Sequence, residues 1–473
     1  MAGEIPQEEK YLKGHYLSHH GVITPGKTTP LRVVFNCSGR MSKNSPSLND
    51  YLEAGPPLMP KIVDVLLRYR MAKIIVMGDV QKAFLQIKVA PQHRQYLRFF
   101  WLKNVQEYLK SGFQPTNIKE YQFGVVIFGS KISPFFMNMA LVVLFDSMED
   151  KMLGEELKDH TYADNGAVTA ETDEEAIYKA ETTIAAFASV KMNFRGIMSN
   201  SDTVRKHFKV EPTQMSMLGL QWDPSTDILK MDLTAKPSLN SKAITKRVVT
   251  AEIGRKYDPL GFVAPVVLRY KTFLQKLWIL NIGWDELLPP EMIEQWKLLM
   301  DEKISFETTR FNGSPFKNSS TEVHVFVDAS MIAYAAVIYL LHKDLDSEAQ
   351  KVEFLICKTK VTPLKPMSIP RLELSAALLG SKLINHVEKT LPKLIVCKKF
   401  LWTDSSAVFY WIQSEKQLKT FVKNRVNAIK EADVNIRHVP TKDNPADLAS
   451  RGCSIDELKD KKLWGKWTCM AYY

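Results

Sequence analysis

Cysteine is scarce in the sequence, and no apolar run is long enough to cross a membrane. The 473 residues include five cysteines, and no two of them form a Cys-x-x-Cys pair. This distribution argues against a disulfide framework and a zinc site, and it favours a reducing, intracellular environment. The most apolar stretch, residues 135–145, is about half the ~20 residues that a membrane-spanning helix needs. The polar N-terminus predicts no signal peptide. We therefore expect a cytoplasmic or nuclear protein that is neither secreted nor membrane-bound.

Acidic residues are fewer than basic ones. Lys and Arg total 63 and Asp and Glu total 52, which gives a net charge of +11. An excess of this size favours a polyanionic partner, most often nucleic acid, although a generic basic protein is the alternative. Because 45% of the residues are hydrophobic, there is material for sizeable cores, and the length suggests about three domains.

The first half of the chain alternates between strand and helix patterns. A run of apolar residues at helical spacing predicts a helix over 61–72, followed by a short buried strand at 74–77. The Asn165-Gly166 pair lies between apolar residues and predicts a hairpin turn within 161–168. The other elements expected here are strands at 31–35 and 121–128, a helix or strand at 84–89, and helices at 133–153 and 174–190.

The second half opens with a helical module and ends with another α/β region. The helices are expected at 245–256, 266–279 and 290–303, and residues 311–320 have the composition of a linker. After them come strands at 322–327, 334–341, 352–357 and 399–403 and helices at 371–388 and 405–413. The pattern therefore predicts a mixed α/β (α+β) fold.

Two aspartates in the first half could bind divalent ions. Asp79 follows the buried strand 74–77, and Asp164 lies beside the expected hairpin. Phosphoryl transfer to a sugar hydroxyl uses two divalent ions held by carboxylates of neighbouring strands, and Mg²⁺ needs few protein ligands. The alternative is that Asp79 ends a strand and Asp164 belongs to a turn, where aspartate is common.

A second set of acids lies in the C-terminal α/β region. Asp328 and Asp404 each follow an apolar strand, and their side chains would emerge at one edge if the two strands are parallel. Glu373 is expected in the first turn of the helix at 371–388, and Asp447 at the start of another helix. Together the four could form a two-metal nuclease site. The alternative for Glu373 and Asp447 is stabilisation by the dipoles of their helices.

Ten short segments between Tyr16 and Trp464 match, in their order and in their residue types, the motifs of a known family. They are residues 31–36, 78–87, 128–135, 162–165, 218–224, 257–262, 327–330, 369–374, 402–405 and 443–451. In this order they resemble the fingers motif, motifs A and B, the Tyr-x-Asp-Asp box and the primer grip of a reverse transcriptase, followed by a ribonuclease H set. The chain resembles the reverse transcriptase–ribonuclease H part of a Bel/Pao-type LTR retrotransposon polyprotein, and segments 257–262 and 369–374 are characteristic of that family.

The resemblance implies a fold and a division into domains. It implies a right-hand polymerase followed by a ribonuclease H-like domain. Fingers and palm would span 1–235, a helical thumb and connection 236–318, the ribonuclease H-like domain 319–452 and a tail 453–473.

The resemblance also implies roles for individual residues. Asp79 and Asp164 would bind two Mg²⁺ ions in the polymerase, and Mn²⁺ could replace them. Arg32 would meet the triphosphate, Phe84 would exclude a ribose 2′-hydroxyl, and Gly129 would line the template and nucleotide pocket. In the nuclease, two metal ions would be held by Asp328, Glu373, Asp404 and Asp447.

The implied activity is RNA-directed DNA polymerisation with cleavage of the RNA in RNA–DNA hybrids. The partners would be an RNA template, a DNA primer, the hybrid and dNTPs. The region is also labelled the Pao retrotransposon peptidase family, but the Asp-Thr-Gly or Asp-Ser-Gly turn of an aspartic protease does not occur, and we expect no protease activity.

The chain departs from the family pattern at two acids. Asn165 replaces the second Asp of the Tyr-x-Asp-Asp box, and Asn36 replaces an Asp of the fingers motif. Losing a negative charge beside two divalent ions predicts an impaired polymerase. Capsid, zinc-knuckle, protease and integrase segments are missing, so we expect a polyprotein fragment of a transposable element that does not transpose on its own. The alternative function is a catalytically decayed, nucleic-acid-binding remnant.

Overall fold

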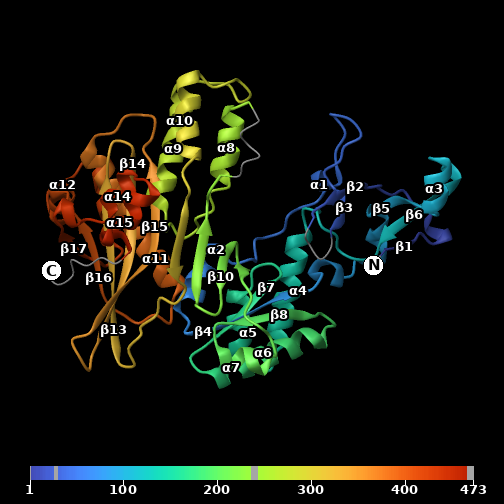
Figure 1. Ribbon diagram of the computed structural model, residues 1–473, viewed down its shortest axis with the longest axis horizontal. Coiled ribbons are helices and arrows are strands. Elements are labelled where there is room, and N and C mark those ends of the chain that lie inside the picture. The colour runs from blue at the N-terminus through green and yellow to red at the C-terminus, as the bar shows by residue number, and fades with distance from the viewer. Residues whose placement is uncertain (1, 26–29, 236–242, 466–473) are drawn as a thin grey trace. The chain divides into compact units, whose positions relative to one another are not determined.

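The computed structural model describes residues 2–25, 30–235 and 243–465 (Figure 1). The chain divides into two compact units. Unit 1 comprises Met1–Lys61 and Ile74–Glu211, and unit 2 comprises Ile62–Lys73 and Pro212–Tyr473. The domain boundary expected at 235/236 adjoins residues outside the described ranges, and Cys469 lies outside them as well.

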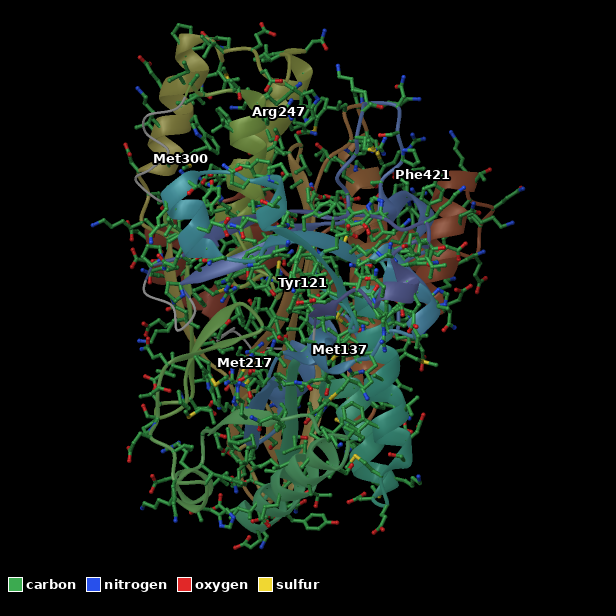
Figure 2. All side chains as sticks on the ribbon, turned by 90° about the vertical axis from the view of Figure 1, so that its right-hand side faces the viewer. Tyr121, Met137, Met217, Arg247, Met300 and Phe421 are labelled. Carbon is green, nitrogen blue, oxygen red and sulfur yellow. The ribbon has the colours of Figure 1, made fainter. Side chains whose placement is uncertain are left out.

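An antiparallel sheet with strand order β7-β4-β8 lies at the centre of unit 1. Its strands are β4 (Ile74–Val80), β7 (Asn165–Ala170) and β8 (Phe194–Ser199). The apolar residues of β4 are buried because helices pack on the sheet, and Met137 (Figure 2) belongs to the resulting core. These helices are α4 (Ser133–Ser147), α5 (Lys151–His160), α6 (Asp173–Ser189) and α7 (Asp202–His207).

The rest of unit 1 is built from two small sheets. Aromatic side chains join them, since Phe35 packs edge-on against Phe99 and Phe123 at centroid distances of 4.9 and 4.8 Å. One sheet has the order β1-β6-β5 and the other is the hairpin β2-β3. Their elements are β1 (Ala2–Glu4), β2 (Ser18–Ile23), β3 (Leu31–Asn36), β5 (Arg98–Leu102) and β6 (Ile118–Phe123), with helices α1 (Leu48–Tyr51) and α3 (Val105–Ser111).

Unit 2 begins with helix α2 (Ile62–Met71) and continues with a four-stranded sheet and a helical module. The sheet has the order β12-β11-β10-β9, and the hairpin between β10 and β11 is antiparallel. Its strands are β9 (Met215–Met217), β10 (Leu220–Asp223), β11 (Ile228–Asp232) and β12 (Ser305–Thr309). The helices of the module are α8 (Lys246–Gly254), α9 (Ala264–Ile279) and α10 (Pro290–Met300), which confirms the three expected helices.

A five-stranded sheet forms the C-terminal part of unit 2, with the order β15-β14-β13-β16-β17. Strand β16 runs parallel to β13 and β17, and the other neighbours are antiparallel. Helix α11 (Ile369–Thr390) packs on one face, where Gly380 comes close to side chains of β13. The strands are β13 (Ser319–Ala329), β14 (Ala333–Asp344), β15 (Gln350–Val361), β16 (Val396–Thr403) and β17 (Asn435–His438). The remaining helices are α12 (Ser406–Gln413), α13 (Thr420–Lys430), α14 (Ala446–Arg451), α15 (Ile455–Asp460) and α16 (Lys462–Gly465).

Residues 257–262 tie helix α9 to strand β15. The partly buried Asp258 carboxylate accepts hydrogen bonds from the backbone N–H groups of Phe262 and Val263, both at 2.9 Å, and desolvation raises its pKa to about 6. Gly261 has a φ of +76°, and a Cβ there would lie 2.2 Å from the carbonyl oxygen of Cys357. This segment is therefore a structural connection, and its glycine permits the close approach.

Several expected elements differ from the structure. The helix expected at 133–153 is two helices, because Met148 is extended and Asp150 caps α5 through the N–H of Leu153. The strand expected at 121–128 ends at Phe123, and a short 3-10 helix, Ala83–Gln86, covers only the start of the element expected at 84–89. Within the expected linker 311–320, Asn312 is fully buried and accepts a hydrogen bond from Arg70.

Four cysteines are free thiols in the described part of the chain, and Cys397 is the exposed one among them. Among residues 2–25, 30–235 and 243–465, no helix combines the length and the apolar character that crossing a bilayer requires.

Candidate active sites

Asp79 and Asp164 lie at the same end of the central sheet of unit 1. Asp79 occurs near the end of β4 and is directly opposite Asn165 in β7. Asp164 immediately precedes β7, and its carbonyl oxygen accepts a hydrogen bond from the N–H of Val80 at 2.8 Å. The fold therefore brings two aspartates that are 85 positions apart in number (164 − 79) to neighbouring backbone positions.

The turn that carries Asp164 differs from the expected Asn165-Gly166 turn. Tyr162 and Asn165 exchange two backbone hydrogen bonds at 2.8 and 3.0 Å, so Ala163 and Asp164 form the turn. Asn165 and Gly166 belong to β7 instead, because they pair with Asp79 and Gly78. Ala163 has a φ of +55°, an unfavourable conformation for a residue with a Cβ. Such strain is often found at functional sites.

Each of the two aspartates has a partner within unit 1. The side-chain amide of Asn165 donates a hydrogen bond of 3.1 Å to Asp164 Oδ1. Arg195 Nε of β8 lies 3.5 Å from Asp79 Oδ2, and both side chains are about half exposed. Gly196 has a φ of +66°, and a Cβ there would come within 2.9 Å of Asp79 Oδ1, so this position favours glycine. One carboxylate therefore lies beside a cationic side chain, and the other accepts a hydrogen bond from an amide.

The residues expected to bind the nucleotide are distributed over unit 1. Phe84 lies in the 3-10 helix after β4, packs against the core and meets the exposed ring of Phe128 edge-on at 4.8 Å. Arg32 is exposed on β3, in a sheet separate from the one that carries Asp79.

Gly129 is held by a side chain that the sequence pattern does not reveal. Its φ is +90°, and a Cβ would lie 3.0 Å from the carbonyl oxygen of Phe35. Asn49 donates to the carbonyl oxygen of Gly129 at 3.0 Å and accepts from the N–H of Lys131 at 2.8 Å. This amide fixes the loop on both sides of Ser130.

Asp328 and Asp404 emerge at one edge of the five-stranded sheet. Strands β13 and β16 are parallel, and Val327 is paired with Thr403, so the next residue of each strand is an aspartate at the same edge. Asp328 is 6% exposed and accepts a hydrogen bond from the hydroxyl of Ser450. Burial raises its pKa to about 7, and the negative charges of Asp404 and Asp447 contribute to this shift although the Ser450 hydrogen bond opposes it.

Glu373 and Asp447 approach the same edge from two helices. Glu373 is in the second turn of α11, because the helix begins at Ile369, two residues earlier than expected. The expectation of a first-turn acid was therefore wrong, and stabilisation by the first turn of the helix does not explain this residue. The Ser405 hydroxyl donates to Glu373, whose pKa is raised by burial and by the charge of Asp404. Asp447 pairs with Arg451 Nε at 2.5 Å within α14.

The four acids at the edge of the five-stranded sheet, Asp328, Glu373, Asp404 and Asp447, are ligand types that suit a hard divalent cation. All four side chains offer carboxylate oxygens, which Mg²⁺ prefers, and the raised pKa of Asp328 reflects the burial of negative charge near other acids. Within the described ranges, no group of three or more His, Cys, Asp or Glu side chains is arranged to hold a metal ion. The structure therefore brings the acids to one edge without showing a closed ligand set.

Two family models match the chain. Residues 32–218 match the model described as reverse transcriptase (RNA-dependent DNA polymerase), and residues 245–405 match the Pao retrotransposon-like RNaseH-like domain. The chain is therefore similar to reverse transcriptases over its first region and to the Pao-type RNase H-like domain over its second. The resemblance to the reverse transcriptase–ribonuclease H part of a Bel/Pao-type retrotransposon is thereby confirmed. No curated protein matches the sequence significantly.

Solved structures support the same fold. Three structures of the foamy viral protease-reverse transcriptase, two with double-stranded DNA and one with an RNA/DNA hybrid, are 10–12% identical to this chain. The first, a dRH form, gives a TM-score of 0.54 and covers 90% of this chain, which in turn spans 65% of that protein. The hybrid complex gives 0.50, with 91% of this chain and 51% of that one covered. The predicted fold class, a mixed α/β polymerase with an RNase H-like domain, is confirmed.

The RNase H-like match begins earlier than the five-stranded sheet. It starts at residue 245 and so includes the helices α8–α10, and it contains Asp328, Glu373 and Asp404 but not Asp447. Asn49, Arg195, Ser405 and Ser450 contact site residues in the two domains and were not found from the sequence. These four residues are recognised only from their contacts in the fold, because each contacts a site residue that is far away in the sequence.

Proposed function

We propose that the chain is a retroelement-derived RNA-directed DNA polymerase with RNA–DNA hybrid ribonuclease H activity, in which the nuclease site is the better preserved. The observation that carries the proposal is that Asp328 and Asp404 lie at one edge of two parallel strands. The negative charge of Asp447 also raises the pKa of Asp328. Buried like charges cost stability, and such arrangements cluster at functional sites. The protein would act inside the cell, in the cytoplasm or the nucleus.

In the nuclease, the residues of this chain would position the carboxylates. Ser450 orients Asp328, Ser405 orients Glu373, and Arg451 restrains Asp447. Each site would hold two Mg²⁺ or Mn²⁺ ions, which would stabilise charge on the phosphate and lower the pKa of the attacking group. That group would be water in the nuclease and the primer 3′-hydroxyl in the polymerase. The four acids would hold them in the nuclease, and Asp79 and Asp164 would hold them in the polymerase.

In the polymerase, the remaining expected residues would act on the nucleotide. Arg32 would meet the triphosphate of a dNTP, since its planar guanidinium suits phosphate. Phe84, supported by Phe128, would exclude a ribose 2′-hydroxyl by its bulk. Gly129, fixed by Asn49, would leave room for template and nucleotide. The RNA template, DNA primer and hybrid are the proposed partners.

A nucleic-acid-binding remnant is the second candidate, and two observations favour it for the polymerase domain. Asn165 donates to Asp164, and Arg195 lies 3.5 Å from Asp79, so each aspartate has a protein partner at the position where a cation would bind. The net charge of +11 would still support binding through phosphates, with a strong dependence on salt.

Cleavage of a hybrid with labelled RNA, in Mg²⁺, tests the nuclease. The wild type and Asp456→Asn, an exposed control in α15, should cleave, and Asp404→Asn should lose the activity. Equal cleavage by wild type and Asp404→Asn would defeat the proposal, because a contaminating nuclease would then explain it. Loss in all three proteins would favour the binding remnant.

A further inference from the structure

One face of the five-stranded sheet is covered over β14 and β15 and hollowed over β16 and β17. On the covered side, the Tyr339 hydroxyl donates to the carbonyl oxygen of Trp464 at 2.9 Å, and the Trp464 ring packs on Phe354. On the same face, over β16 and β17, lies a groove of about 820 Å³. Its lining includes His324, Lys343, Lys398, Phe400, Trp402 and Arg437.

These residues share one face because of strand register. Side chains alternate between the two faces of a sheet, and β16 contributes Lys398, Phe400 and Trp402 at every second position. His324 is paired with Phe400, and Trp402 is paired with Arg437. Helix α11 packs on the opposite face of the sheet, so it does not cover the groove.

The floor of the groove is aromatic and is fixed by hydrogen bonds. Trp402 Nε1 donates to His324 Nδ1 at 3.0 Å, and the His324 ring stacks on Phe400 at 4.9 Å and 23°. His324 Nδ1 accepts, so its Nε2 carries the proton and donates to Glu322 at 3.2 Å. Burial lowers the pKa of His324, which agrees with a neutral ring. Phe400 is thus a partly exposed ring on a preorganised support.

The rim of the groove is cationic. Glu322 is paired with Lys343 Nζ at 3.0 Å. Lys398 and Arg437 are exposed, and within residues 2–25, 30–235 and 243–465 neither makes an ion pair. Exposed cations beside an aromatic ring match a single nucleic acid strand, which offers phosphates on one side and unstacked bases on the other. A base pair in a duplex does not present its face in this way.

The direction of β16 relates the groove to the nuclease edge. The groove follows β16 from Lys398 to Trp402 and also includes His438, which pairs with Thr403. Asp404 is the next residue after Thr403. A strand lying in the groove would therefore run along β16 toward the edge that carries the acids.

We propose that this groove binds a short single-stranded segment of nucleic acid, with phosphates at Lys398 and Arg437 and a base on Phe400. The site adds single-strand binding to the proposed function and does not require turnover at either active site. It would hold an unpaired end or flank of a substrate against the RNase H-like domain.

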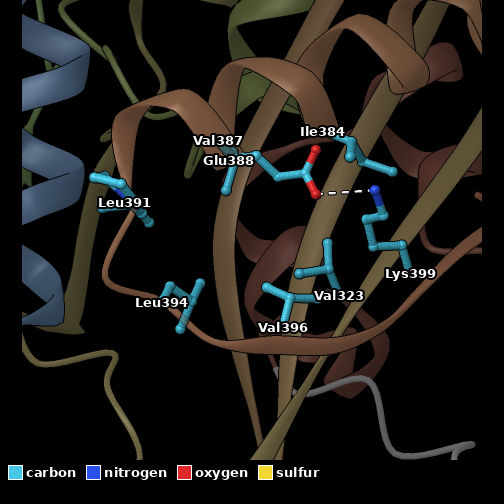
Figure 3. Close-up of a pocket in the computed structure, with 9 residues that line it drawn as sticks. Val323, Ile384, Val387, Glu388, Leu391, Leu394, Val396 and Lys399 are labelled. Atoms are coloured by element: carbon cyan, nitrogen blue, oxygen red, sulfur yellow. Dashed lines mark ion pairs between the residues drawn. The ribbon is translucent and has the colours of Figure 1, made fainter. Parts of the chain in front are cut away.

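A second cavity, on the α11 side of the sheet, has a different character (Figure 3). It measures about 260 Å³ and is lined by apolar residues such as Val323, Ile384 and Leu391. Its two charged residues, Glu388 and Lys399, neutralise each other at 2.9 Å. This cavity has no cationic rim and so does not match a phosphate chain.

Binding of a labelled single-stranded oligonucleotide of about eight nucleotides to the full chain, in EDTA, tests the proposal. Lys398→Glu/Arg437→Glu should weaken binding about tenfold or more at physiological salt. It should also reduce the slope of log K against log salt by about 1.4, because each phosphate contact on a single strand contributes about 0.7. Lys389→Glu/Lys393→Glu, with the same charge change at the end of α11 and in the following loop, should bind the oligonucleotide more tightly than the groove variant.

A photocrosslink locates the base. An oligonucleotide carrying 5-iodouracil should crosslink to Phe400, Trp402 or Phe409, the aromatic residues that line the groove. Equal weakening by the two double variants, or crosslinks only outside the groove, would overturn the proposal. The proposal would also be overturned if a blunt duplex bound with the same affinity and lost as much affinity in the groove variant. It would equally be overturned if the wild-type chain formed a dimer that the groove variant disrupts. Failure of hybrid cleavage leaves this test intact, since EDTA removes the need for catalysis.

Discussion

The acids of the reverse transcriptase domain and those of the RNase H-like domain differ in how deeply they are buried. In the first domain, Asp79 is about half exposed and lies beside Arg195, and Asp164 accepts from the amide of Asn165. In the second, Asp328 is buried near Asp404 and Asp447, and its pKa rises to about 7. Each site has one aspartate beside an arginine, since Asp447 pairs with Arg451. The comparison therefore indicates that the sites differ in burial, because only the second holds a buried aspartate near other acids, an arrangement that a cation would relieve.

The largest expected effect is at Asp328. The substitution Asp328→Asn should reduce hybrid cleavage on the order of 100-fold or more, because it removes a charged ligand from the proposed metal site. The same change should raise the melting temperature at pH 8 in EDTA, since a buried charge disappears. Asp456→Asn should do neither, and a lower melting temperature of Asp328→Asn at pH 8 would contradict the electrostatic account.

The pH dependence of stability carries the same information. The carboxyl pKa of Asp328 is about 7 in the fold against an ordinary value of 3.8. Between these values the folded state keeps a proton that the unfolded state releases, so the contribution of Asp328 to the free energy of unfolding falls as pH rises from about 4 to about 7. Differential scanning calorimetry of wild type and Asp328→Asn should show this difference, and parallel curves for the two proteins would rule it out.

A smaller effect is expected at Arg195. Because its guanidinium lies 3.5 Å from Asp79, Arg195→Gln should lower the Mg²⁺ concentration for half-maximal primer extension, about threefold for a half-exposed pair. The experiment is best done together with Asn165→Asp, where extension is expected to be measurable. Lys191→Gln, an exposed change before β8, is the control. A higher Mg²⁺ requirement would mean that Arg195 supports the site instead of competing for it.

The smallest effect on activity is expected at Asp258. Its carboxylate satisfies two backbone N–H groups at the start of α9, so Asp258→Ala should lower the free energy of unfolding by about 1–2 kcal/mol. Specific activity per folded molecule should stay the same in both domains. Urea unfolding and hybrid cleavage measured on one preparation would check this, and a selective loss of cleavage would show that residues 257–262 do more than connect α9 to β15.

The parts of the fold that follow from local periodicity were predictable. Apolar strands before Asp328 and Asp404 predicted a common edge if the two strands were parallel, and the parallel register of β13 and β16 confirms it. The three helices between 245 and 303 were likewise evident from their apolar spacing and their prolines.

The parts that depend on distant contacts were not predictable. Ser450 reaches Asp328 across 122 positions, and Asn49 reaches Gly129 across 80. The turn before β7 shows the same limit, because pairing of Asn165 and Gly166 with β4 overrides their local preference for a turn. Single-sequence patterns carry no signal for such partners.

The most direct test of the central claim is primer extension on an RNA template, measured for wild type and Asn165→Asp in the preparation that is also assayed for hybrid cleavage. Replacing the amide by a carboxylate should increase extension on the order of tenfold, the factor that about 1.4 kcal/mol of transition-state stabilisation gives. Hybrid cleavage should be unchanged, and Asn44→Asp, an exposed change of the same type, should alter neither activity. Equal extension by wild type and Asn165→Asp, with no cleavage by either, would contradict the account that the nuclease is preserved and the polymerase is weakened at position 165.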